Sequence, residues 1–498
     1  MNEFINIVND ETLTYQQMLV SMTKLAESYD HTIQYNPKLL KAKDEDCICD
    51  LNEGKALYRP RYIIVDFKKF LTEGSNFLEL DAPRDLMEAC NNLLILYKHI
   101  PSVTNYPVYL GGFDELLEEF VIKEDRNFAK KVLKLFLLNI DRTLNDSFVH
   151  ANIGPYDTTT GRLILELTKE MQLAIPNISL KYDENKTSDE FANMAIKCML
   201  KTAKPSFAND VMYSQEWTSN YAIASCYNAL KIGGGGLTLS RLKLATMAKK
   251  AKSIDDYIDN IIPKYCSLML EFMDTKINFL IEDTAFFKSN FLVKEGLLNV
   301  DDFTGMFGIV GVAEACNHLL NLSNNDGFGK NEEANKLGEK ILDTIEMIVN
   351  NHDSKYAKNF NHKYRLHAQV GIDSDGFDNS PGARIPIGSE PELLEQVLHS
   401  TRFHKYFPTG VGDIYKFDET WYQTPDAILN IIKGAFINKA RYFSCYLDNC
   451  DVVRVTGYLV KKSELEKLDS SKQSLNQVSI FGKGARDKAN ALDRKITK

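Results

Sequence analysis

Short strand-like runs alternate with long helical stretches along this chain of 498 residues. Apolar residues recur at helical spacing in residues 114–144, 253–280 and 331–350, which predicts long amphipathic helices. Runs rich in β-branched and aromatic residues predict strands; they lie at residues 62–67, 106–110, 221–224, 306–312 and 452–460. Strands interleaved with helices indicate an α/β fold.

The composition is that of a globular protein, with 44% hydrophobic and 26% charged residues. A net charge of −9 argues against nucleic acid as a partner, because phosphate backbones attract basic surfaces. The first residues lack the basic start and apolar run of a signal peptide, and we find no apolar run long enough for a membrane span. We therefore expect a cytoplasmic protein whose nine scattered cysteines are reduced thiols.

The domain organisation is expected to be simple. The sequence shows no internal repeat and no linker rich in Pro, Gly or Ser. After residue 462 the chain becomes polar and mildly basic. We predict one domain over residues 1–462 and a polar C-terminal tail over residues 463–498.

One pentapeptide near the C-terminus, Arg454-Val455-Thr456-Gly457-Tyr458, carries the strongest functional signal. A strand that ends in a glycine bulge would explain it structurally. The pentapeptide also resembles the signature of glycyl radical enzymes, which store an unpaired electron on the α-carbon of one glycine. Glycine suits this task because it lacks a Cβ, so the radical can flatten and delocalise into both flanking peptide groups.

The resemblance also implies a cysteine partner, because the stored radical takes hydrogen from a cysteine whose thiyl then attacks substrate. Cys226 is the best candidate. It follows the strand-like run 221–224 and precedes the flexible Gly233–Gly236, so it can project from a sharp turn.

The chain further resembles the YjjI family of glycine radical enzymes over about residues 45–460. The segments that carry this resemblance are Pro60–Tyr62, Pro101–Thr104, His150–Pro155, Ser225–Asn228, Met306–Ala315, His367–Gln369, Ser380–Arg384 and Val453–Tyr458. The resemblance implies a ten-stranded β/α barrel of two half-barrels, wrapped by helices. The cysteine loop and a glycyl loop at about residues 445–462 would meet inside it.

The same resemblance implies what the chain works with. A separate radical S-adenosylmethionine activating enzyme, with its own iron–sulfur cluster, would form the radical on Gly457. We expect no metal in this chain, no nucleic acid or membrane partner, a small-molecule substrate and, by the habit of the superfamily, a homodimer.

Known reaction types can be compared with the residues present. Pyruvate formate-lyase types use adjacent cysteines, and the sequence has no such pair. Anaerobic ribonucleotide reductases carry a four-cysteine zinc site before the glycine, whereas here only Cys445 and Cys450 precede it closely. Nucleotide reduction stays open as an alternative, since Gly233–Gly236 could approach phosphates. A catalytically inactive paralogue that binds a partner is a further alternative.

Elimination from a small hydroxylated substrate is the preferred reaction, because it needs one cysteine and one glycine. Diol dehydratase types place a glutamate two residues after the cysteine, where this chain has Asn228, an amide that cannot take a proton at neutral pH. By neighbourhood in the family-like segments, Glu314 and His367 are predicted to act in catalysis, with Asp373 as another candidate base. The predicted substrate-binding residues are Asn228, Gln369, Arg384, His150 and Asn152.

Overall fold

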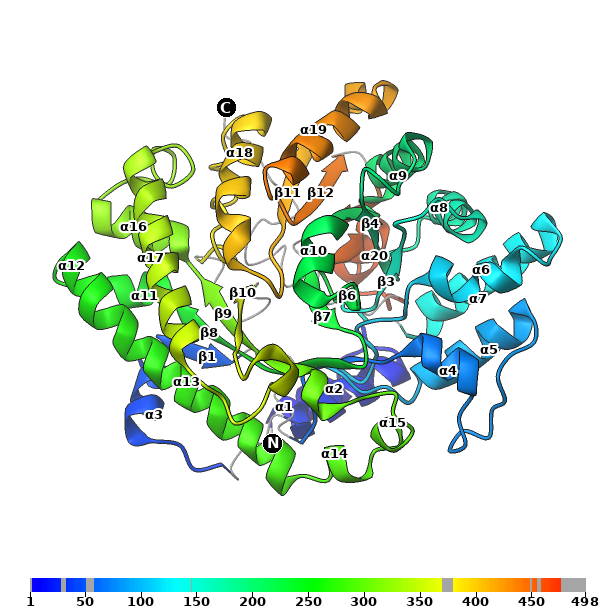
Figure 1. Ribbon diagram of the computed structural model, residues 1–498, viewed down its shortest axis with the longest axis horizontal. Helices are drawn as coiled ribbons and strands as arrows, with labels where there is room; N and C mark the ends of the chain where they lie inside the picture. Colours follow the sequence, from blue (N-terminus) through cyan, green and yellow to red (C-terminus); the bar gives the residue numbers. More distant parts are fainter. Residues whose placement is uncertain are drawn as a thin grey trace.

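Two five-stranded β-sheets form the interior of the molecule, and helices surround them (Figure 1). The computed structural model describes residues 2–27, 33–50, 58–144, 146–369, 379–447, 450–454 and 458–475. Within these residues no strand pairing joins the two sheets directly.

The first sheet is built around one long strand, β8. Its members are β1 (Ile48–Asp50), β2 (Tyr62–Ile64), β8 (Gly234–Lys243), β9 (Phe303–Val310) and β10 (Arg365–Ala368). Strands β8, β9 and β10 are parallel neighbours, and β1 and β2 pair antiparallel with opposite ends of β8. The residues of the parallel strands are almost all buried, as is usual for parallel sheets, because both faces of such sheets are covered.

The second sheet has the strand order β11-β12-β5-β4-β3. Its members are β3 (His150–Ile153), β4 (Asn177–Tyr182), β5 (Ser206–Asn209), β11 (Asp413–Phe417) and β12 (Tyr442–Leu447). Strands β3, β4 and β5 are parallel, β12 runs antiparallel to β5, and β11 runs parallel to β12. Ten strands in two sheets within a helical shell agree with the predicted fold class.

The helices cover the outside of the two sheets. In the first half of the chain they are α1 (Asn2–Val8), α2 (Tyr15–Glu27), α3 (Pro37–Asp44), α4 (Phe67–Glu73), α5 (Leu86–Tyr97), α6 (Phe113–Val121), α7 (Arg126–Thr143), α8 (Thr159–Met171), α9 (Asp189–Thr202), α10 (Asp210–Trp217) and α11 (Leu244–Ala248). In the second half they are α12 (Ile254–Asp256), α13 (Ile262–Asn278), α14 (Phe286–Ser289), α15 (Phe291–Lys294), α16 (Val312–Leu320), α17 (Glu332–Asn351), α18 (Leu393–Phe403), α19 (Pro425–Ile437) and α20 (Lys462–Asp469).

Most of the predicted elements are present, with changes at their ends. The helices predicted at 253–280 and 331–350 are confirmed, the first as α12 and α13 joined by a π-helical turn. The stretch 114–144 is two helices, because Asp125 caps α7 by accepting hydrogen bonds from Asn127 and Phe128. The strand predicted at 106–110 is wrong: this segment bonds to β3 through Leu110 N–H to His150 O (2.8 Å) without forming a strand.

Three of the four consecutive glycines serve strand packing. Gly234–Gly236 form the start of β8, between β2 and β9. A Cβ at Gly234 would collide with the carbonyl of Asp302, and one at Gly235 would collide with that of Tyr62. Only glycine allows backbones to approach so closely, so these residues have a structural role that needs no phosphate.

Ordered structure extends past residue 462. Helix α20 buries Leu465 and Leu468, and Ser474 is almost fully buried. Gln17 on α2 donates to the Ser474 carbonyl (2.9 Å). Residues 463–475 therefore belong to the folded body and not to a polar tail, while 476–498 lie outside the described residues.

Candidate functional site

Cys226 lies at the tip of a small hairpin, as its sequence context predicted. Strands β6 (Tyr221–Ala224) and β7 (Asn228–Lys231) pair antiparallel and form the cysteine hairpin, residues 221–231. Ser225 at the tip has a φ of 60°, a left-handed conformation that costs a non-glycine residue about 1 kcal/mol. Within residues 221–230, Cys226 is the one residue that is partly and not fully buried.

The face of the second sheet toward this hairpin is polar. Alternate residues of a strand point to the same face, and the polar ones are His150, Asn152, Asn177, Ser179, Lys181, Ser206, Tyr442 and Ser444. The residues between them, such as Ile178, Leu180 and Phe443, are apolar and buried against the helices. Buried polar side chains need hydrogen-bond partners, and the backbone of the cysteine hairpin supplies several of them.

The first strand of the hairpin is held by side chains that act like a neighbouring strand. Asn152 donates from Nδ2 to the Ile223 carbonyl (2.8 Å), and its Oδ1 accepts from the Ile223 N–H (2.9 Å). Lys181 donates from Nζ to the Tyr221 carbonyl (2.7 Å). Both side chains are buried, so they replace the strand partner that β6 lacks on this side.

The tip is held by two side chains linked through Ser179. His150 Nδ1 lies 3.0 Å from the Ser225 carbonyl, which can only accept, so Nδ1 carries the proton. Nε2 then accepts from the Ser179 hydroxyl (2.9 Å). Tyr442 donates to the Cys226 carbonyl (2.9 Å), and its hydroxyl lies 3.0 Å from Ser179 Oγ. Burial lowers the pKa of His150 to about 3, which keeps the ring neutral.

Contacts with β10 of the first sheet and with the loop before β11 hold the other side of the hairpin. Tyr227 donates its hydroxyl to the Ala368 carbonyl at the end of β10 (2.9 Å). Ala229 N–H donates to the Thr409 carbonyl (2.9 Å). The hairpin thus lies between the two sheets and connects them.

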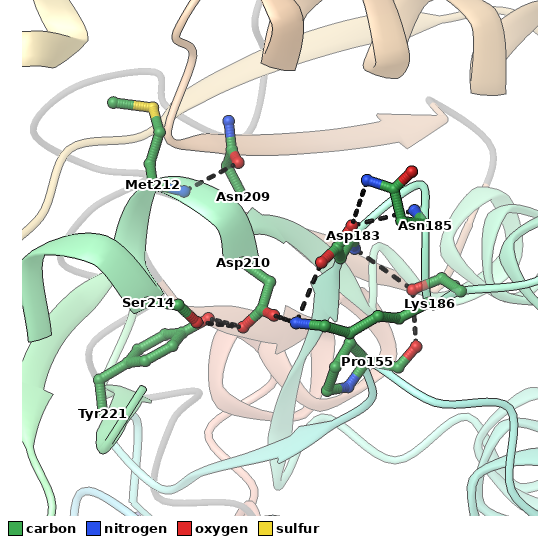
Figure 2. A network of polar contacts seen from close by, with 10 residues as sticks. Pro155, Asp183, Asn185, Lys186, Asn209, Asp210, Met212, Ser214 and Tyr221 are labelled. Atoms are coloured by element: carbon green, nitrogen blue, oxygen red, sulfur yellow. Dashed lines mark hydrogen bonds and ion pairs between the residues drawn. The ribbon is translucent and has the colours of Figure 1, made fainter. Parts of the chain in front are cut away.

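A charged network fixes the start of the hairpin to the second sheet (Figure 2). The Tyr221 hydroxyl donates to Asp210 Oδ1 (2.7 Å), just after β5. Lys186 bridges Asp210 (3.1 Å) and Asp183 (3.0 Å), which follow β5 and β4. Figure 2 shows these groups converging at one end of the sheet, so both the tip and the base of the hairpin are anchored.

The thiol of Cys226 is set up as a hydrogen donor. Its Sγ donates to Asn228 Oδ1 across the hairpin (3.5 Å). Burial raises the pKa of Cys226 to about 11, so the sulfur keeps its proton at neutral pH. Nucleophilic cysteines have lowered pKa values, whereas transfer of a hydrogen atom requires an intact S–H bond.

The glycine motif lies in a second hairpin, formed by β13 (Val452–Arg454) and β14 (Leu459–Lys461) and called here the glycine hairpin. Gly457 itself lies outside the described residues, as do Val455 and Thr456. Arg454 is buried and donates from Nη2 to the Ala203 carbonyl (2.7 Å) and to Asn177 Oδ1 (3.3 Å).

The flank of the glycine motif approaches the cysteine tip. Asn177, which Arg454 contacts, is the strand partner of His150, and His150 bonds to Ser225. The positive charge of Arg454 also lowers the pKa of Cys226, against the larger effect of burial. Arg454 and Cys226 are thus close in space although 228 positions separate them in the sequence (454 minus 226).

Two of the predicted site residues are used to hold a loop. Glu314 accepts from the Ser380 N–H (2.9 Å) and hydroxyl (2.7 Å). Arg384 pairs with Asp413 (Nε to Oδ1, 3.3 Å), and both are buried. These contacts anchor residues 380–384 to α16 and to β11.

Two other predicted residues come near the hairpin. His367 on β10 has its ring centroid 6.0 Å from that of Tyr227, and burial lowers its pKa to about 3. Gln369 follows directly and is buried, whereas Asp373 lies outside the described residues. In the described part of the chain, His367 Nδ1 and Asn228 Nδ2 are buried and have no hydrogen-bond partner.

The sequence reasoning missed Ser179, Lys181 and Tyr442. Their signal was the alternation of polar and apolar residues in 177–182 and 442–447, which predicts strands with one polar face. The described part of the chain shows no group of three His, Cys, Asp or Glu side chains able to hold a metal. No described helix is both long and apolar enough to cross a membrane.

Solved structures identify the class of fold. The chain superposes on the anaerobic ribonucleotide reductase of Thermotoga maritima in complex with dATP and CTP with a TM-score of 0.68, at 14% identity, over 97% of this chain and 93% of that one. It superposes on the hydroxyproline dehydratase of Clostridioides difficile with a TM-score of 0.69, at 11% identity, over 97% of this chain and 88% of that one. The protein therefore has the fold of glycyl radical enzymes.

The family follows from sequence. Residues 13–497 match the family model of YjjI-like glycyl radical enzymes. A protein of Haemophilus influenzae is 44% identical over all of this chain and 97% of its own length. The protein YjjI of Escherichia coli is 38% identical over 97% of this chain and 93% of its own length. The chain belongs to the YjjI-like glycyl radical enzyme family.

Proposed function

We propose that this enzyme stores a radical on Gly457 and uses Cys226 to start an elimination from a small hydroxylated substrate. The observation that supports it best is the state of Cys226: a protonated, partly exposed thiol at the tip of a buried hairpin, close to Arg454 of the glycine motif. A radical S-adenosylmethionine activating enzyme would remove one hydrogen atom from Gly457.

The proposed reaction balances in atoms and electrons. The Cys226 S–H gives its hydrogen atom to Gly457, which leaves a thiyl. The thiyl takes a hydrogen atom from a substrate carbon that bears a hydroxyl. The neighbouring carbon then loses its own hydroxyl group, which leaves as water with the proton of the first hydroxyl, and the first carbon becomes a carbonyl. The product radical takes the hydrogen back from Cys226, and the thiyl recovers the hydrogen of Gly457. The net change is substrate to product plus water.

Asn228 is proposed to orient both the thiol and the substrate. Its Oδ1 accepts from the Cys226 S–H (3.5 Å), and its Nδ2 is a buried donor with no partner among the described residues. A substrate hydroxyl would satisfy that donor, since buried polar groups are almost always hydrogen-bonded. Substrate would then bind next to the sulfur.

The proton that leaves with the hydroxyl needs an acid–base group near the hairpin. His367 is our candidate, because its neutral ring lies beside Tyr227 and its Nδ1 has no partner within the described residues. Gln369, which follows it, remains a proposed substrate contact. His150, Asn152, Glu314 and Arg384 are proposed to position the site without touching substrate. His150 and Asn152 are bonded to the hairpin, Glu314 is bonded to Ser380, and Arg384 pairs with Asp413.

Product analysis tests the reaction class. The enzyme, activated without oxygen, is incubated with a panel of vicinal diols and other hydroxylated compounds, and products are measured by mass spectrometry. A product lighter than its substrate by one water, absent with Cys226→Ser, supports the proposal. A ribonucleotide converted to its deoxy form would instead establish nucleotide reduction and overturn the elimination.

A further inference from the structure

Tyr442 has no place in the sequence motifs, yet it is the one side chain in the described part of the chain that donates a hydrogen bond to the backbone of Cys226. We propose that Tyr442 is the positioning residue that fixes Cys226 for hydrogen transfer with Gly457. This inference rests on the proposed function.

The tip of the cysteine hairpin needs outside support. Ser225 adopts a left-handed φ of 60°, which the surroundings must maintain. The two carbonyls that flank Cys226 Cα on this side are those of Ser225 and Cys226, and they are held by His150 and Tyr442 respectively. Removing the Tyr442 bond frees the peptide that carries the thiol residue.

Tyr442 is itself held firmly. It is almost fully buried, begins β12 and pairs with Ala208 of β5. Its ring packs edge-on against Tyr227, with centroids 6.0 Å apart, and its hydroxyl lies 3.0 Å from Ser179. A side chain fixed in this way defines one position for the Cys226 carbonyl.

The same chain segment serves both partners of the transfer. Gly457 lies 15 residues after Tyr442 (457 minus 442), and β12 packs against β13 of the glycine hairpin. One segment therefore holds the cysteine peptide at its start and carries the radical glycine near its end. Hydrogen transfer is steeply sensitive to the separation of the two atoms, and a displacement of about 1 Å can slow a positioned reaction by about a hundredfold.

Exchange of the glycine hydrogen measures this transfer without any substrate. The remaining α-hydrogen of a glycyl radical splits its EPR signal into a doublet. Each return of hydrogen from Cys226 in D₂O can bring a deuterium to Gly457, because thiol hydrogens exchange with solvent. The doublet then collapses, and the rate of collapse reports the transfer between Cys226 and Gly457.

The test compares Tyr442→Phe with Tyr213→Phe. Tyr213 is a matched control, since it is equally buried in the same aromatic cluster and its hydroxyl has no partner among the described residues. We expect Tyr442→Phe to form the doublet but to lose its splitting at least about tenfold more slowly than the parent. Tyr213→Phe should match the parent, and Cys226→Ser should keep the doublet indefinitely.

Each other outcome has a defined meaning. A parental rate in Tyr442→Phe, or equal slowing in Tyr213→Phe, would overturn the inference. A parent doublet that never collapses would contradict the transfer itself, and no doublet in the parent would contradict the proposed function. If Tyr442→Phe does not fold, the Ser179→Ala variant is measured in its place. A slower collapse of its EPR doublet would support the inference, and a parental rate of collapse would overturn it.

Discussion

The cysteine hairpin and the glycine hairpin are attached to the molecule in different ways. The cysteine hairpin is hydrogen-bonded along its length. It accepts bonds from the second sheet at Tyr221, Ile223, Ser225 and Cys226, and it donates from Tyr227 to the first sheet and from Ala229 to Thr409. The glycine hairpin is bonded at its flanks: Arg454 contacts Asn177 of the second sheet, and Asp451 accepts from Lys462 and Ser463 at the start of α20.

Beyond α20, the C-terminal segment is tied to the N-terminal helix. Gln17 donates to the Ser474 carbonyl (2.9 Å), and Gln473 donates to the Leu13 carbonyl (3.0 Å). These contacts can break without disturbing either sheet, whereas the cysteine hairpin cannot leave without opening both. The comparison indicates that the cysteine hairpin is held more firmly than the segment that follows the glycine hairpin.

The largest expected effect comes from Cys226→Ser. A hydroxyl O–H bond is too strong for a glycyl radical to break, so turnover should disappear while the EPR doublet of Gly457 remains. Cys450→Ser, a partly buried cysteine outside the cysteine hairpin, is the matched control and should keep turnover. Product formed by Cys226→Ser would move the thiyl role to another cysteine.

Asn152→Ala tests how firmly the cysteine hairpin is held. The substitution leaves the buried N–H and C=O of Ile223 without partners, which should lower the free energy of unfolding by about 3 kcal/mol. Asn220→Ala, at the exposed end of the same hairpin, should change it by less than about 0.5 kcal/mol. Urea unfolding measures both, and equal effects would contradict the role given to Asn152.

The neutral histidines predict how stability depends on pH. Burial lowers the pKa of His150 and of His367 to about 3, from an ordinary value of 6.5. Their stabilising contribution is complete above pH 6.5 and is lost as the pH falls toward 3, because the unfolded chain takes up protons first. The unfolding free energy should therefore fall between pH 6.5 and pH 4. The His150→Gln variant should take up about one proton fewer on unfolding in that range, so its unfolding free energy should change less steeply with pH. An unchanged dependence of the unfolding free energy on pH would contradict the burial of a neutral His150.

The smallest effect is expected at helix α2. Gln17→Ala removes the bond to Ser474 and should raise hydrogen–deuterium exchange in residues 459–475, with a local loss of about 1 kcal/mol. The cysteine hairpin should keep its parental exchange. Gln16→Ala, exposed on the same helix, is the control. Faster exchange in residues 221–231 would show that the two hairpins are not held independently.

The sequence was sufficient for the class of fold and for the family, since the segments around Gly457 and Cys226 stand in recognisable local contexts; the roles of these two residues stay predictions. It placed His150 and Asn152 in the right region but could not show that their side chains bond to the backbone of Ser225 and Ile223. Such contacts depend on residues more than 70 positions apart. The roles of Glu314 and Arg384 were hidden in the same way, because their partners Ser380 and Asp413 follow from packing and not from spacing.

The central claim is that Gly457 carries a radical that Cys226 can reach. The most direct test is an anaerobic EPR spectrum recorded after incubation with the activating enzyme and S-adenosylmethionine, with Gly457→Ala treated in parallel. The account predicts a doublet in the parent and none in Gly457→Ala. A parent without a signal, beside an activating enzyme shown to be competent, or a signal that survives in Gly457→Ala, would contradict it.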